Sequence, residues 1–153
     1  MPSPARLVAA LLMAVVGWMG AEAVVIFALP DWVSPGRLHW IAAGLGLIVG
    51  WRILGRVASG PIGKGDRLMV GMTGGLGAVL VVVLGTIVVH AVLETYDDAV
   101  RLAFSGPGDA LAGMAQVVVD DVVLLMEPRA LAVILGGGAI AGLAAGIAGR
   151  IWW

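Results

Sequence analysis

Residues Leu68–Leu93 read LMVGMTGGLGAVLVVVLGTIVVHAVL and contain no Asp, Glu, Lys or Arg. As an α-helix rising about 1.5 Å per residue, this run is longer than the hydrocarbon core of a bilayer, which is roughly 30 Å thick. Arg67 precedes the run and Glu94 follows it directly. A long apolar run with charges at both ends predicts a membrane-spanning helix.

The rest of the chain has a similar composition. Of its 153 residues, 61% are hydrophobic and 12% are charged, with a mean hydropathy of +1.06. Soluble domains have about 25% charged residues, so this chain has too few polar side chains to cover a water-soluble surface. Because no segment is polar enough to form a second domain, we expect residues 1–153 to form one membrane domain.

Three other apolar runs are long enough to cross a bilayer, at about residues 5–29, 38–58 and 130–151. For the first run a cleaved signal peptide is the alternative, because Ala21-Glu22-Ala23 has the small-residue pattern of a cleavage site. The apolar character continues through Val24–Leu29, which favours an uncleaved span. With Leu68–Leu93, these runs predict an all-α integral membrane four-helix bundle.

Between spans three and four, the pattern predicts helices that do not cross the membrane. Residues 94–104 are expected to extend the third helix beyond the apolar core. Residues 109–126 then place apolar side chains on one helical face and polar ones on the other, and the Asp120-Asp121 pair comes too early for a span. We therefore predict an amphipathic interfacial helix here, lying at the membrane surface or partly inserted. Its apolar face comprises Leu111, Met114, Val118, Val122 and Leu125.

The distribution of Lys and Arg predicts the orientation, because cytoplasmic loops carry an excess of these residues. Four spans divide the nine basic residues into six on one side and three on the other. We therefore expect both termini and the second loop in the cytoplasm, with an acidic opposite face. The six are Arg6, Arg52, Arg56, Lys64, Arg67 and Arg150, and the three are Arg37, Arg101 and Arg129.

Glycine recurs at steps of four in the predicted spans. Small residues at this spacing let helix backbones approach closely in lipid, where no hydrophobic effect drives the helices together. We expect these faces to pack within one bundle, and a seam with a second copy or a larger complex is the alternative. The candidate packing residues are Gly46, Gly50, Gly71, Gly75, Gly138, Gly142 and Gly146.

Two charged residues fall inside predicted spans, Glu22 and Arg52. An ionisable group within a span is costly and is a functional candidate by default. Glu22 lies at a depth near His39 and His90, so it could pair with either histidine to relay protons or hold a metal. Arg52 could bind an anion from the cytoplasm. The simpler interpretations are a wetted, hydrogen-bonded glutamate and an arginine whose side chain extends to the inner headgroups.

The sequence gives little indication of redox chemistry, metal binding, catalysis or nucleic-acid binding. The chain has no cysteine, which excludes disulfides, thiolate metal sites and cysteine nucleophiles. No catalytic arrangement of polar residues is apparent, and the few basic residues are explained by topology rather than by nucleic-acid binding. We therefore expect no enzyme activity, no cofactor and no resident metal, with membrane lipids as the principal surroundings.

Several segments spread over the chain resemble one protein family. They are residues 1–10, MPSPARLVAA; residues 46–56, GLIVGWRILGR; Arg101-Leu102; Gly106-Pro107 with the acid and Ala-Leu that follow; and the glycine-rich last span, which ends in Arg150-Ile151-Trp152. Together they resemble the TrgA family, small alphaproteobacterial membrane proteins associated with tellurite resistance. The resemblance implies an inner-membrane protein linked to tolerance of the oxyanion tellurite, and it implies no catalytic residues.

Three hypotheses about function follow. The first is a non-enzymatic protein of the TrgA type, for which export or an indirect envelope role suits the acidic outer face better than tellurite uptake. The second is a small accessory or assembly subunit of a larger membrane complex, contacted through the glycine-rich faces. The third is a transporter that uses Arg52 or Glu22, which the absence of an internal repeat disfavours.

Overall fold

The computed structural model describes residues 4–30, 36–60, 66–101 and 103–151, and every regular element in these ranges is helical. The predicted cytoplasmic Lys64, the side chain of Arg67, and Leu102, Trp152 and Trp153 lie outside what the structure describes. The elements are α1 (Pro4–Phe27), α2 (Leu38–Val49), η1 (Gly50–Leu54), α3 (Gly55–Ala58), α4 (Arg67–Val100), α5 (Pro107–Leu125) and α6 (Pro128–Ile151).

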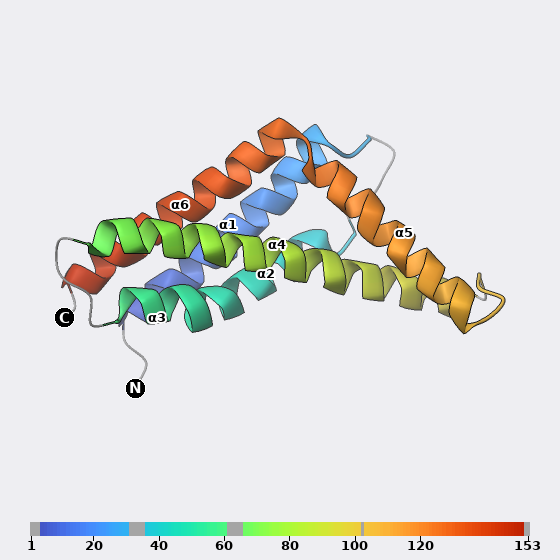
Figure 1. The fold of residues 1–153 in the computed structure, drawn as a ribbon, viewed down its shortest axis with the longest axis horizontal. Helices are drawn as coiled ribbons and strands as arrows, with labels where there is room; N and C mark the ends of the chain where they lie inside the picture. Colours follow the sequence, from blue (N-terminus) through green and yellow to red (C-terminus); the bar gives the residue numbers. More distant parts are fainter. Residues whose placement is uncertain (1–3, 31–35, 61–65, 102, 152–153) are drawn as a thin grey trace.

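Four helical segments are long and apolar enough to cross a membrane: Pro4–Phe27, Leu38–Ala58, Leu68–Val100 and Pro128–Ile151. The predicted all-helical, four-span architecture is thus confirmed by length and composition. Figure 1 shows that α1 begins and α6 ends at one end of the molecule, next to α3 and the start of α4. The basic residues predicted to lie in the cytoplasm on these elements, such as Arg6, Arg56 and Arg150, are therefore at this same end, which we call the basic end.

The helix α4 is longer than the apolar run that predicted it. It continues without a break past Leu93 to Val100, and its 34 residues extend about 50 Å at the usual rise of an α-helix. The predicted extension beyond the apolar core is therefore present as far as Val100, and Phe104 lies outside the helix.

The second span contains a local irregularity that the sequence pattern did not predict. At Gly50–Leu54 the helix widens into one π-helical turn, in which the Gly55 N–H donates to the Gly50 carbonyl five residues earlier. Such turns insert a residue into an otherwise regular α-helix. The turn separates α2 from α3 and leaves Leu54 fully buried.

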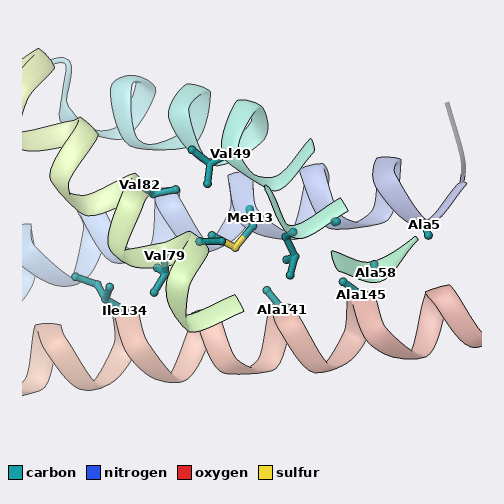
Figure 2. Packing of buried hydrophobic residues seen from close by; sticks show 12 residues of the cluster. Ala5, Met13, Val49, Ala58, Val79, Val82, Ile134, Ala141 and Ala145 are labelled. Atoms are coloured by element: carbon teal, nitrogen blue, oxygen red, sulfur yellow. The ribbon is translucent and has the colours of Figure 1, made fainter. Parts of the chain in front are cut away.

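The core is formed by small and medium-sized side chains between α1, α2, α4 and α6. Figure 2 shows Met13 of α1 among side chains of the neighbouring helices, including Val49, Val79 and Ala141. Met13, Leu54 and Val79 are the largest side chains that are fully buried. Many larger apolar side chains instead face outward, such as Leu84 and Ile140, which are 63% and 68% exposed. An apolar exterior over a small-residue interior is typical of helices that pack in lipid.

Helix α5 forms a hairpin with the second half of α4 and leads back to the start of α6 (Figure 1). Its bounds agree closely with the predicted helix at residues 109–126. None of its residues is buried, and Leu111 and Val122 of the predicted apolar face are exposed. A helix at this place is confirmed, and its position relative to a membrane surface stays a prediction.

Candidate functional site

A cavity of about 430 Å³ lies between the outer half of α1, the start of α2, the second half of α4, the end of α5 and α6. This volume is in the range of small-molecule binding sites, about 300–1,000 Å³. Most of its wall is apolar, with contributions from Val16, Val83, Val117 and Ile134. The cavity lies in the half of the molecule away from the basic end (Figure 1).

Small residues on α1 and α2, which pack directly against each other at Gly17 and Ala42, form one side of the space. On α1, the wall is formed in part by Gly17, Gly20 and Ala21, which have little or no side chain. On α2 the facing residue is Ala42. Helix α5 then covers the space with side chains that are only half-buried, such as Leu124.

Polar groups of the cavity wall lie on α4 and α5, and they are predominantly acidic. They comprise His90 and Glu94 of α4 and Asp120 and Asp121 of α5. Glu94 and Asp120 are exposed, which places these groups where the cavity meets the surface. We call this group of four residues the acidic opening. Deeper in the wall, the Thr86 hydroxyl donates to the Val82 carbonyl at 2.8 Å and is therefore satisfied within its own helix.

An imidazole–carboxylate pair connects α4 to α5 at the acidic opening. His90 Nδ1 lies 2.9 Å from Asp121 Oδ2, and His90 Nε2 lies 3.7 Å from Glu94 Oε1. Because an ionised carboxylate can only accept hydrogen bonds, the imidazole N–H is the donor to Asp121. Asp120 accepts a hydrogen bond from Gln116 Nε2 at 3.0 Å, within α5 itself. Asp121 and Glu94 thus face a single imidazole, and Asp120 lines the cavity next to them in the chain.

Glu22 pairs with His39 rather than with His90. The Glu22 Oε2 and His39 Nε2 atoms are 2.7 Å apart, and the imidazole of His39 also lies 5.0 Å from the Trp18 ring, centroid to centroid. The carboxyl side chain is 51% exposed, whereas the histidine side chain is 13% exposed. The structure therefore selects one of the two pairings considered from the sequence and makes His90 part of a different cluster.

Arg52 lies on the exposed side of the π-helical turn, away from the acidic opening. The sequence placed Glu22 and Arg52 in different spans as separate candidates, and the structure does not bring them together. Among the described residues, no group of three or more His, Asp or Glu side chains is arranged to hold a metal ion.

The predicted glycine faces lie at helix–helix contacts within the chain. A methyl group on Gly71 or Gly75 of α4 would overlap the backbone of Gly142 or Gly138 of α6. In the same way, Gly46 and Gly50 of α2 and η1 meet the backbone of α1 at Met13 and Ala9. Gly146 is buried, with its Cα next to Gly71. These contacts agree with the predicted close packing inside one bundle.

Sequence reasoning missed the cavity and the role of α5 in closing it. The sequence used the Asp120-Asp121 pair as evidence against a span, yet Asp121 is 16% exposed and hydrogen-bonded to His90. The pair joins residues 31 positions apart, so no local periodicity indicates it. A histidine inside an apolar span was the one signal that pointed to a partner on another helix.

Comparison of the chain with protein family models, with curated proteins and with solved structures gave no match.

Proposed function

We propose that the chain is a non-enzymatic, multi-pass protein of the bacterial inner membrane that contributes to tellurite tolerance, as its resemblance to the TrgA family implies. Four helices of membrane-spanning length and composition support the membrane location. The excess of Lys and Arg at the basic end supports cytoplasmic termini.

The observation that carries this proposal is that three segments of the resemblance meet in space. Gly50 lies against the backbone of Ala9 and Ala10, and Gly55 lies against Arg6. The Arg6 Nε–H donates to the Ser59 hydroxyl at 3.3 Å. Ala145, in the glycine-rich last helix, belongs to the same core cluster as Ala9. Segments far apart in the sequence thus form one packed unit at the basic end.

The chemistry of the described residues supports a role without catalysis. The chain has no thiol to reduce tellurite. The acidic opening repels an oxyanion, because its three carboxyl groups outnumber the single imidazole. An indirect role in the cell envelope, or export, is therefore favoured over capture of tellurite from outside.

A deletion strain complemented with the wild-type gene tests this proposal. We expect deletion to increase tellurite sensitivity and the wild-type chain to restore tolerance. Glu22→Gln and Arg52→Ala, expressed at wild-type levels, should restore tolerance as well, since the proposal does not use transport through these groups. Unchanged sensitivity on deletion would contradict the proposed function. Loss of tolerance with either variant would favour the transporter hypothesis.

A second candidate function is an accessory or assembly subunit of a larger membrane complex. The observation in its favour is that α5 has no buried residue and exposes Leu111, Val119, Val123 and Met126. The glycine faces on α2, α4 and α6 already contact helices of this chain, so a partner would meet other surfaces. Extraction in mild detergent should then recover a larger complex, and recovery of only the single chain or a homo-oligomer would contradict this role.

A further inference from the structure

We propose that the cavity binds an amphiphile with a cationic ammonium head and a single apolar chain. The head would lie at the acidic opening, and the chain would occupy the space between α1, α2, α4 and α6. This inference stands on the geometry of the cavity and is independent of the proposed role in tellurite tolerance.

The shape and lining of the cavity indicate the apolar part of the ligand. Aliphatic side chains on five helices face the space, and the hydroxyl of Thr86 is already bonded to the Val82 carbonyl. Few polar atoms in the deep wall are therefore left to specify a hydrogen-bonding ligand. A flexible hydrocarbon chain fits such a wall, because burying it removes apolar surface without leaving a polar group unpaired.

The acidic opening indicates the charge of the head. Glu94, Asp120 and Asp121 supply three carboxyl groups, and His90 is the one basic side chain in the cavity wall. Arg37, which lines a neighbouring hollow together with Glu94, pairs with Asp97 at 3.8 Å. Charge complementarity therefore favours a cation, and carboxylates at the edge of an apolar site bind an ammonium group more strongly than they would in water.

Photolabelling of the full chain in phosphatidylcholine nanodiscs tests the proposal. The probe is decylamine with a diazirine on its alkyl chain, and the matched probe is a decyl sulfate with the same diazirine. We expect the amine to label peptides that contain Gly17–Val24 and Val79–His90, and the sulfate to label them about tenfold less. Equal labelling of these peptides by the two probes would overturn the assignment of a cationic head.

Two pairs of variants test whether photolabelling depends on binding of the probe inside the cavity. Val83→Phe fills the cavity from α4, while Val81→Phe adds the same volume on the exposed side of that helix. Val117→Phe and Val119→Phe form the equivalent pair on α5, where no residue is buried and folding is less at risk. We expect labelling to fall about tenfold in Val83→Phe and Val117→Phe only. Wild-type labelling in both cavity variants would overturn the site.

The carboxyl groups are tested by Asp120→Asn combined with Asp121→Asn, with Asp98→Asn as the control outside the cavity wall. We expect the double variant to label equally with the amine and the sulfate, and the control to keep the preference for the amine. A preference for the amine that persists in the double variant would contradict the role of these residues.

Discussion

The two halves of α4 pack in contrasting ways. Its first half approaches α6 so closely that Gly71 and Gly75 touch the backbone of the glycines opposite. Its second half contacts α5 through the His90–Asp121 hydrogen bond and leaves a cavity of about 430 Å³ beside it. The same helix is therefore held by backbone contact at one end and by side-chain contacts, including the His90–Asp121 and Arg37–Asp97 pairs, at the other.

This difference shows what small residues do in two settings. At the α4–α6 contact, glycines face glycines, and the space they leave is taken by the other backbone. At the cavity, Gly17 packs against the backbone of α2 at Ala42 and Gly20 lies against the Ile134 side chain, while the space beside them is lined by side chains and stays open. In lipid no hydrophobic effect closes gaps between helices. The close α4–α6 contact therefore stabilises the bundle, whereas the cavity leaves room for a ligand.

The largest expected effect comes from adding one methyl group to the α4–α6 contact. Gly75→Ala would overlap the Gly138 carbonyl, and we expect the free energy of unfolding to fall by about 1–3 kcal/mol. Gly77→Ala, two residues along the helix, meets nothing within 4 Å and should be neutral or stabilising by up to about 1 kcal/mol. Denaturation followed by circular dichroism measures both. Equal stability of the two variants would contradict the close contact.

A smaller and more local effect is expected at the other half of α4. Asp121→Asn weakens the charge-assisted hydrogen bond to His90, and such bonds contribute about 1.5–3 kcal/mol. Because this bond connects α5 to α4, amide hydrogen exchange should accelerate in α5 and stay unchanged in α1 and α6. Asp120→Asn, whose hydrogen bond lies within α5, is the control. Acceleration spread evenly over all helices would show that α5 is not a separable unit.

The smallest effect is expected at the Glu22–His39 pair. The carboxyl side chain is half exposed, so solvent screens its interaction with the imidazole. We expect Glu22→Gln to change the free energy of unfolding by less than about 1 kcal/mol, measured in the same denaturation experiment. A loss as large as that of Gly75→Ala would show that this pair, and not the glycine contact, dominates the stability of the bundle.

The sequence was sufficient for the parts of the fold that depend on local composition. Long apolar runs predicted the four spans to within two residues, except that the third helix continues to Val100. Glycines at every fourth position predicted that Gly71 and Gly75 would contact another backbone. Which helix they meet depends on tertiary packing, and the same holds for the His90–Asp121 pair. The π-helical turn at Gly50–Leu54 has no signal in the hydrophobic pattern, because one inserted residue barely changes it.

The candidate site was less predictable than the fold. Glu22 and His39 form one of the two pairs considered from the sequence. The cavity depends on how α1 and α4 diverge and on where α5 lies, which are properties of several helices at once. The sequence assigned no role to Gly17 and Gly20 of its wall, because a glycine in an apolar run does not reveal which helix lies opposite.

The most direct test of the account is the accessibility of single cysteines on either side of α4. Because the chain has no native cysteine, Asp66→Cys and Ser105→Cys each introduce a unique thiol at an exposed residue. In intact spheroplasts, a membrane-impermeant maleimide should label Ser105→Cys at once and Asp66→Cys only after permeabilisation. Labelling of Asp66→Cys in intact spheroplasts, or of both thiols from the same side, would contradict a span at Leu68–Leu93 with its basic end in the cytoplasm.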